Sequence, residues 1–374
     1  MRSTYDVIIV GAGIVGAACA MECACHGMSV AVVEDDVVGG GATAAGMGHI
    51  VVMDDSPAQL ALTWYSQQLW NELSPQLPQD VEYEATGTIW IATDVSEMEE
   101  IFRKQAFYEA HGIPVQVLDQ QTLRDAEPNL HRNLVGGLLV SSDAVLYPPC
   151  AARYFFLEAE KGGTVTYRKR AVAIGQGSVK LSDGTTLISS RLVNAMGAMA
   201  TDLTPGLNIR KRKGHLVITD RAPGFVRHQL VEVGYLRSAG SSSGNSVAFN
   251  VQPRKTGQIL IGSSRQYDAE GKQVDPPVLL QMMQRVQQYL PGVKDLPVIR
   301  TWTGFRAATP DKLPLIGPHP DDATLFLATG HEGLGITTSL ATAKLLAHSF
   351  TGIAGVLSPE PYLPSRLFLE TQNA

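Results

Sequence analysis

The feature that most constrains this chain is a strand–turn–helix–strand pattern at residues 7–34. Four apolar residues run into the turn GAGIVG, an alanine-rich helix follows, and a second β-branched run ends at Glu34. In such a turn Gly11 permits the tight bend, Gly13 lets a pyrophosphate approach the backbone, and Gly16 lets the helix pack on the strand. Glu34 follows Gly16 by 18 positions, where a carboxylate can bind ribose hydroxyls. The pattern predicts a dinucleotide-binding βαβ unit.

The carboxylate of Glu34 also distinguishes among the dinucleotides that this unit could bind. Glu34 would repel the extra phosphate of NADP, so FAD and NAD remain. Residues 37–49 then read VVGGGATAAGMGH, a loop of glycines and small residues that a large ligand can approach closely. We expect Thr43 and the N–H groups near residues 45–47 to form a second cradle. An extended FAD needs such a cradle and NAD does not.

Composition gives an ordinary globular protein. The chain has 374 residues, 44% hydrophobic and 18% charged, with a formal net charge of −6. This length suits two domains, and the charge provides no basic field for nucleic acid. No apolar run approaches the roughly 18 residues of a membrane span, and the first strand begins too early to leave room for a signal peptide. We expect a cytoplasmic protein whose membrane contact is at most peripheral.

The four cysteines make neither a disulfide framework nor a clear metal site. Three of them (Cys19, Cys23 and Cys25) lie in the first helix, and Cys150 is far away along the chain. Buried thiols that act as small apolar residues are the preferred interpretation. We expect no metal.

The rest of the chain predicts two kinds of sheet. Residues 164–195 and 214–262 favour strands, whereas residues 324–350 return to a strand, a glycine loop and a helix. The expected fold class is α/β, with a Rossmann-like FAD-binding domain and an inserted, mostly antiparallel β-sheet substrate domain. The expected FAD-binding domain comprises residues 1–80, 145–205 and 303–374, and the substrate domain residues 81–144 and 206–302.

Two local predictions concern the beginning of the substrate domain. Residues 81–91 alternate well enough for a pair of strands with a turn at Gly87. Residues 96–111 read as a helix that Ser96 caps, with Glu99 completing a capping box.

Several motifs together resemble the FAD-dependent D-amino-acid oxidase superfamily. They are VGAGIVG with Glu34, GGGATAAGMG, the strand end VNAMGA, WTGFR with TPDKLPLIG, and ATGHEGLGIT. The layout is most similar to glycine oxidase and to the catalytic subunits of hydroxyproline or proline dehydrogenases, from about residue 5 to residue 350. The resemblance implies the two-domain fold described above. It also implies noncovalent FAD, because residues 309–335 hold no cysteine of the kind that attaches flavin in some relatives.

The resemblance further implies where FAD binds. Residues 11–16 would carry the cofactor, residues 42–47 would meet its diphosphate and flavin, and residues 331–337 would close over the flavin. Val172 would contact adenine through its backbone. The cofactor residues so implied are Gly11, Gly13, Ile14, Val15, Gly16, Glu34, Asp35, Ala42, Thr43, Ala45, Gly46, Met47, Val172, Ala195, Gly197, His331, Glu332, Gly333, Leu334, Gly335, Ile336 and Thr337.

For the substrate, the resemblance points first to Arg306. In the family this arginine pairs with the amino-acid carboxylate, and a planar guanidinium suits that task because it binds a carboxylate through two hydrogen bonds. Asn250 and Arg265 stand where glycine oxidase has a tyrosine and a methionine, which implies a more polar pocket. If the alignment is shifted by one residue, Phe249 would line the pocket in place of Asn250. His49 lies near the flavin or is simply a packed loop histidine.

Three other charged or titratable residues receive lesser roles. We expect His331 to shape the glycine loop rather than to move protons, and Glu332 to be solvated or at a partner surface. His215 is an outside candidate for the pocket. No side chain is assigned as a catalytic acid or base, because an amine that enters neutral does not require one.

The function implied is FAD-dependent oxidation of a small D-amino or imino acid, with D-hydroxyproline or D-proline favoured. Hydride would pass from Cα to flavin N5 and leave an imine that hydrolyses in water. One alternative is a glycine or sarcosine oxidase that produces hydrogen peroxide. Another is a flavin-carrying subunit of an electron-transfer complex, and a third is an NAD-dependent reductase, which the second cradle disfavours. Small partner subunits in a hetero-oligomer are a live hypothesis.

Overall fold

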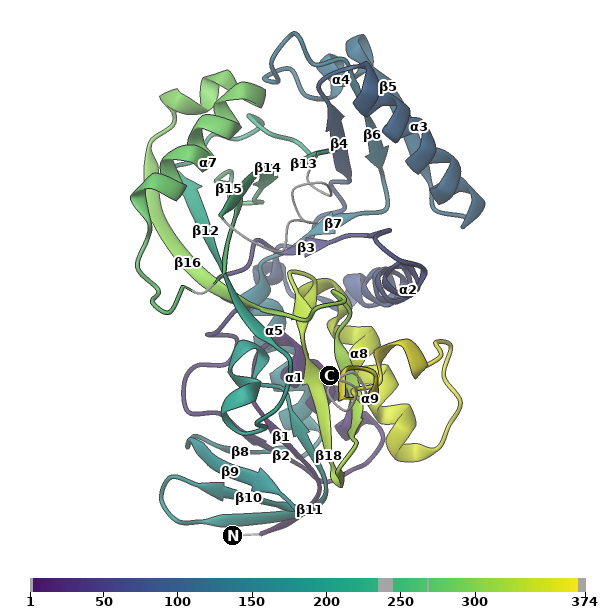
Figure 1. Ribbon diagram of the computed structural model, residues 1–374, viewed down its shortest axis with the longest axis vertical. Helices are drawn as coiled ribbons and strands as arrows, with labels where there is room; N and C mark the ends of the chain where they lie inside the picture. Colours follow the sequence, from purple (N-terminus) through teal and green to yellow (C-terminus); the bar gives the residue numbers. More distant parts are fainter. Residues whose placement is uncertain (1–2, 235–244, 268, 369–374) are drawn as a thin grey trace.

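The computed structural model describes residues 3–234, 245–267 and 269–368, and in it two large sheets lie at opposite ends of the molecule (Figure 1). The strands of the first sheet are β1 (Thr4–Val10), β2 (Val30–Val33), β8 (Val165–Tyr167), β9 (Ala171–Gly175), β10 (Ser178–Leu181), β11 (Thr186–Asn194), β17 (Leu315–His319) and β18 (Asp322–Thr329). They run in the order β17-β18-β11-β1-β2-β8, and β10 and β9 extend from β11.

The centre of this sheet is parallel. β1 runs parallel to β2 and β11, β2 to β8, and β11 to β18. β2 is buried along its whole length and β1 over its last four residues, as expected for strands covered on both faces. The covering helices include α1 (Ile14–Cys25), α5 (Pro148–Lys161) and α8 (Gly335–Thr351), with α2 (Pro57–Leu73) against α8.

The second sheet is almost entirely antiparallel. Its strands are β4 (Thr88–Ala92), β5 (Val115–Asp119), β6 (Gly136–Val140), β12 (Arg210–Thr219), β13 (Gln229–Glu232), β14 (Ser246–Pro253), β15 (Ile259–Tyr267), β16 (Val298–Ala308) and β19 (His331–Glu332). Among the described residues they run in the order β19-β16-β12-β15-β14-β13-β4-β6-β5, and the β13–β4 pair alone is parallel. The expected α/β fold class, with its Rossmann-like part and its antiparallel part, is confirmed.

Alternation along β14 decides which side chains face which layer. Phe249 and Val251 lie in the core beneath α7 (Pro276–Tyr289), and the ring of Phe249 stacks on Tyr289 with centroids 4.2 Å apart. Since neighbours on a strand point to opposite faces, Asn250 faces away from α7. Phe249 is therefore a core residue, and the alternative that made it a pocket wall is wrong.

The remaining elements frame this sheet. They are α3 (Val95–Ala110), α4 (Gln120–Ala126), the short pair β3 (His49–Ile50) and β7 (Ala144–Val145), and α9 (Ser365–Phe368). Leu123 of α4 shares the core beneath α7, whereas Ile101 of α3 packs with Trp90 on the opposite face. No helix of the described ranges has the length and apolar character needed to span a bilayer.

The two local predictions at the beginning of the substrate domain are each right in part. The predicted helix is present as α3, but its predicted cap and capping box are wrong. Of the predicted pair of strands, only the second is present, as β4. Helix α3 is capped by Asp94, whose Oδ1 accepts from the Glu97 backbone N–H at 2.9 Å; a carboxylate at a helix N-terminus competes well with a hydroxyl because the helix dipole favours it. Of residues 81–91, only those from Thr88 onward join the sheet, because the backbone of Glu84 bridges Val145 instead.

The expected domain limits stay a prediction. The limit at residues 302 and 303 falls inside β16, which runs unbroken from Val298 to Ala308. β19, from the segment expected in the FAD-binding domain, pairs with the end of β16. Gly330 alone separates the end of β18 in the first sheet from the start of β19 in the second, so the two sheets come together next to the residues considered below.

Candidate functional site

The glycine turn between β1 and α1 is tightly built. Gly11 has φ +103°, and a Cβ there would lie 2.8 Å from the carbonyl oxygen of Ala195 at the end of β11. A Cβ on Gly16 would lie 2.0 Å from the carbonyl oxygen of Gly11. Glu34 supports the turn, because its Oε2 accepts from the Ala12 backbone N–H at 2.7 Å. Gly11 and Gly16 therefore cannot be replaced by larger residues without a backbone shift, and the start of α1 presents backbone N–H groups of the kind that bind phosphate.

The second cradle lies against the first. Thr43 Oγ1 accepts from the Ile14 backbone N–H at 3.0 Å, and the Gly39 N–H donates to the Ala12 carbonyl at 2.8 Å. Thr43 therefore ties the second cradle to the first turn of α1, whose N-cap is Gly13. Ala42 and Ala45 lie in the same loop, and a Cβ on Gly304 of β16 would be 2.3 Å from Cβ of Ala45. Asp35, in contrast, is an exposed residue just after β2.

The start of α8 joins these two loops. A Cβ on Gly46 would lie 2.8 Å from Cδ1 of Ile336, and one on Gly335 would lie 3.8 Å from Cγ2 of Val15. Thr337 Oγ1 donates to the carbonyl of His49 at 2.9 Å. Leu334 precedes α8 as its N-cap. Two helix N-termini and the ends of parallel strands thus converge, which is the arrangement that holds a dinucleotide.

Ala195 and Gly197 lie at the same edge of the parallel sheet. Ala195 follows β11 and packs against Gly11, as described above. Gly197 has φ +56°, and its carbonyl accepts from Thr329 Oγ1 at 2.9 Å. The structure therefore brings both residues close to the glycine turn.

In the loop before α8, two residues have side chains that contact other residues of the protein. His331 Nε2 lies 2.9 Å from Thr342 Oγ1 of α8, and burial lowers the pKa of His331 to about 3. This agrees with a role in shaping the loop. Glu332 forms a close, largely buried ion pair with Arg212 of β12, so the expectation that it is solvated or at a partner surface is wrong: β12 supplies a cation that the local sequence does not reveal.

Arg306 lies between the antiparallel sheet and this loop. A Cβ on Gly214 of β12 would lie 2.6 Å from Nη1 of Arg306, and one on Gly333 would lie 3.6 Å from its Nε. Nη1 donates to the carbonyl oxygen of Ser264 on β15 at 3.0 Å. The guanidinium is therefore seated on a glycine and held from the neighbouring strand.

The pKa of His49 is affected by the nearby charge of Arg306. Burial and the positive charge of Arg306 lower the pKa of His49 to about 3. Its Nε2 is buried and has no hydrogen-bond partner among the described residues. At neutral pH the ring is uncharged and offers a donor or an acceptor beside Arg306.

Asn250 faces the cofactor loop. On the same face of β14, Gln252 Nε2 donates to the carbonyl of Met47 at 3.0 Å, and a Cβ on Gly262, the cross-strand neighbour of Asn250, would lie 3.2 Å from Sδ of Met47. Within the described ranges the buried Oδ1 of Asn250 has no partner. Arg265 lies further along β15, 4% exposed and in register with Ser246. The two substitutions that suggested a polar pocket thus lie on neighbouring strands.

Sequence reasoning missed Gln252, Ser263 and Ser264. Gln252 stands two positions after Asn250, so the two-residue period of a strand was a usable signal. Ser263 Oγ is also buried without a partner among the residues described. The role of Ser264 depends on the register between β12, β15 and β16, for which the sequence has no local signal.

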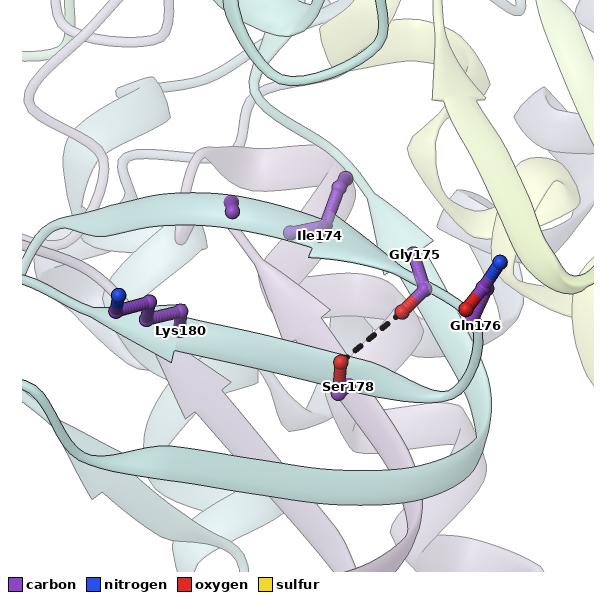
Figure 2. A pocket seen from close by; sticks show the side chains of 6 residues that line it. Ile174, Gly175, Gln176, Ser178 and Lys180 are labelled. Atoms are coloured by element: carbon purple, nitrogen blue, oxygen red, sulfur yellow. Dashed lines mark hydrogen bonds between the residues drawn. The ribbon is translucent and has the colours of Figure 1, made fainter.

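Val172 lies apart from the glycine turn, on the outer hairpin of the first sheet. This residue of β9 is 42% exposed. Figure 2 shows the adjoining hollow between β9 and β10, lined by Ala173, Ile174, Gly175, Gln176, Ser178 and Lys180, where Ser178 Oγ donates to the Gly175 carbonyl at 3.1 Å. None of the residues expected to hold FAD lines this hollow. The adenine contact of Val172 stays a prediction.

The residues present fit FAD. An isolated glycine turn suits any dinucleotide, but here a second loop and a second helix N-terminus lie against it, and buried polar atoms of His49, Asn250 and Ser263 remain without partners in the described part of the chain. The roles of individual residues toward FAD and substrate stay predictions.

Comparisons with known proteins agree with this geometry. Glycine oxidase of Geobacillus kaustophilus is 27% identical over 93% of each chain. Hydrogen cyanide synthase subunit HcnC of Pseudomonas aeruginosa is 26% identical and covers 98% of this chain and 97% of its own.

Two solved structures share the fold. The crystal structure of the Geobacillus kaustophilus glycine oxidase superposes with a TM-score of 0.87, at 25% identity and with 98% of this chain and 99% of that one covered. L-proline dehydrogenase from P. horikoshii gives a TM-score of 0.88 at 22% identity, with 99% of each chain covered.

The family model for DAO, FAD dependent oxidoreductase, matches residues 6–349. This range contains the glycine turn, the second cradle, Arg306 and the start of α8. The cofactor is therefore FAD, and the chain belongs to the DAO family of FAD-dependent oxidoreductases.

Proposed function

We propose that this protein oxidises a small D-amino or imino acid, with D-hydroxyproline or D-proline favoured over glycine. The observation that carries the proposal is the seat of Arg306. Its guanidinium rests on Gly214, is held by the carbonyl of Ser264, and lies beside Gly333 in the loop that leads to α8. The arginine is thus fixed at the boundary between the antiparallel sheet and the cofactor loops.

A guanidinium in that position suits a carboxylate. It carries five N–H donors in a planar fork, and two of them can bind both oxygens of one carboxylate. Because Nη1 already donates to Ser264, the plane of the fork is set before substrate arrives. Gly214 leaves room for the guanidinium itself, because a Cβ there would lie 2.6 Å from Nη1.

The buried side-chain amide of Asn250 favours a substrate that has a hydrogen-bond donor besides its amine. Asn250 is only 5% exposed, and its Oδ1 lacks a partner among the described residues. A buried acceptor left unpaired costs about 1–3 kcal/mol, and the hydroxyl of hydroxyproline can remove this cost. Glycine has no hydrogen-bond donor besides its amine that could pair with this oxygen.

The chemistry divides between cofactor and protein. When bound, FAD supplies the acceptor for the hydride that leaves the substrate Cα. Arg306 would bind the carboxylate and so orient the Cα–H bond, while His49, whose pKa is lowered to about 3, stays uncharged at neutral pH. The substrate loses a hydride and a proton and becomes an imine, which water hydrolyses.

Two other functions have specific support. Glycine oxidase is the name of several relatives of this chain, so glycine or sarcosine is the second substrate class. Another relative is a subunit of hydrogen cyanide synthase, and others are bifunctional proteins, ThiO/ThiG. Assembly with small partner subunits is therefore a further proposal.

The test is anaerobic reduction of the bound flavin. The FAD-loaded protein is mixed without oxygen with D-hydroxyproline, D-proline, L-proline, glycine or sarcosine, and the visible flavin band is followed. Pyrrolidine, which has the ring of proline and no carboxylate, is the matched control. We expect D-hydroxyproline to bleach the band at the lowest concentration and pyrrolidine to fail. Bleaching by glycine or sarcosine alone would replace the favoured substrate with the second class.

A further inference from the structure

His215 is a buried residue that joins three elements behind Arg306. It lies on β12 with no exposed surface. Its Nδ1 is 2.8 Å from Oγ of Ser264 on β15, and its backbone N–H donates to the same Oγ at 2.9 Å. Its Nε2 accepts from the backbone N–H of Asp275 at 2.9 Å, at the residue that caps α7.

These contacts assign the tautomer of the ring. A backbone N–H can only donate, so Nε2 must be an acceptor and carries no proton. In the neutral ring the proton is then on Nδ1, which donates to Ser264 Oγ. Burial and the charges of Lys213 and Arg306 lower the pKa of His215, and the nearby carboxylate of Asp275 opposes them. Protonation would place a second donor against the Asp275 N–H, so the network requires the neutral ring.

Ser264 connects this histidine to the substrate arginine. Its hydroxyl is held by His215, and its carbonyl oxygen accepts from Nη1 of Arg306 at 3.0 Å. Gly214, the residue before His215, is the seat of the same guanidinium. Both the carbonyl that holds Arg306 and the surface on which Arg306 rests are therefore adjacent to His215 in space or in sequence.

We propose that His215 is a positioning residue: by fixing Ser264, it sets the orientation in which Arg306 meets the substrate carboxylate. The physical reason is that an arginine side chain has many rotamers, and a guanidinium fixed in advance loses less entropy when a carboxylate binds. His215 itself touches no substrate. This inference rests on the proposed function of Arg306, and its test separates the two.

The two ring nitrogens can be imitated one at a time. In His215→Asn the side-chain amide nitrogen replaces Nδ1, so the bond to Ser264 is kept and the acceptor for Asp275 is lost. In His215→Gln the amide reaches the place of Nε2, so the contact with Asp275 is kept and the bond to Ser264 is lost. Ser264→Ala removes the hydroxyl and keeps the carbonyl. His228→Gln is the matched control, because His228 is bonded to Glu127 elsewhere in the protein.

The readout is binding of pyrrole-2-carboxylate, a flat carboxylate of the size of proline that has no Cα–H bond to oxidise. Its dissociation constant is measured on the FAD-loaded enzyme from the change in the flavin spectrum. We expect His215→Gln and Ser264→Ala each to raise it about tenfold, as for the loss of one hydrogen bond. We expect His215→Asn to raise it much less and His228→Gln not at all. Bound FAD should stay the same in all four.

A double mutant distinguishes positioning from a general structural effect. If His215 acts through Arg306, then His215→Gln adds nothing to the weakened binding of Arg306→Leu. Additive losses, or equal losses in His215→Asn and His215→Gln, would overturn the inference. Unchanged binding in Arg306→Leu itself would overturn the proposed function, whereas weakened binding in Arg306→Leu with none in His215→Gln would overturn the role of His215 alone.

Discussion

Replacing Gly16 with alanine tests whether the glycine turn is built to hold FAD. The new Cβ would lie 2.0 Å from the carbonyl oxygen of Gly11 and 3.3 Å from Cβ of Ala195. To restore van der Waals distance, the start of α1 must move about 1 Å away from β1. The helix has little room for this, since Ala17 and Ala18 are completely buried.

The size of the effect follows from that displacement. Overpacking of this kind costs about 1–3 kcal/mol of folding free energy. Thr43 of the second cradle accepts from the Ile14 N–H at the start of α1. A shift of α1 therefore also changes the position of the helix N-terminus relative to the second cradle. A misplacement of about 1 Å can cost on the order of 100-fold where groups must be held in register. We therefore expect FAD affinity to fall by at least about tenfold.

The assay is titration of the apoprotein with FAD, followed by quenching of flavin fluorescence, together with the unfolding temperature. Gly234→Ala is the matched control, because a Cβ at Gly234, outside both cradles, meets only Oε1 of Glu97 at 3.4 Å; it should bind FAD like the wild type. If Gly16→Ala binds FAD as tightly as Gly234→Ala does, the close packing of the turn has no bearing on the cofactor and the reasoning is refuted.

Three further predictions concern single side chains. Glu34→Ala removes the support of the Ala12 N–H and the proposed ribose contact, so the variant should lose FAD during gel filtration; a fully yellow preparation would contradict this. Asn250→Leu should lower the ratio of kcat/KM for hydroxyproline over proline about tenfold, as for one lost hydrogen bond, and an unchanged ratio would remove Asn250 from the pocket. Native His331, with its pKa lowered to about 3, stays neutral at pH values where the unfolded residue is protonated. As the pH falls below about 6.5, this residue should therefore lower the free energy of unfolding by about 1.4 kcal/mol per pH unit. When the pH is lowered from neutral to 5, the free energy of unfolding measured in urea should decrease less for His331→Gln than for the wild type. Equal decreases in the two proteins would exclude His331 as the cause.

Much of the cofactor region could be predicted because its signals are local. The glycine spacing, the β-branched strands and Glu34 lie within one short stretch. In the structure that stretch forms β1, the glycine turn, α1 and β2, and Glu34 directly follows β2. The loops around residues 42–47 and 331–337 were expected to serve the same ligand. The close approach of Gly46 to Ile336 shows that they do meet.

The rest depends on contacts between distant segments. The cap of α3 was misassigned because Ser96 and Asp94 are both good caps, and only the structure shows which one reaches a free N–H. The ion pair of Glu332 with Arg212 and the contacts of His215 require the register of β12 against its neighbours. Sequence spacing has no information about that register, so the environment of Arg306 could not be predicted.

The central claim is that Arg306 holds the substrate carboxylate while FAD accepts the hydride. The most direct measurement is the rate of anaerobic flavin reduction against the concentration of D-proline, for the wild type and Arg306→Leu with equal FAD content. The account predicts an apparent dissociation constant that rises on the order of 100-fold. Identical concentration dependence in the two proteins would contradict it.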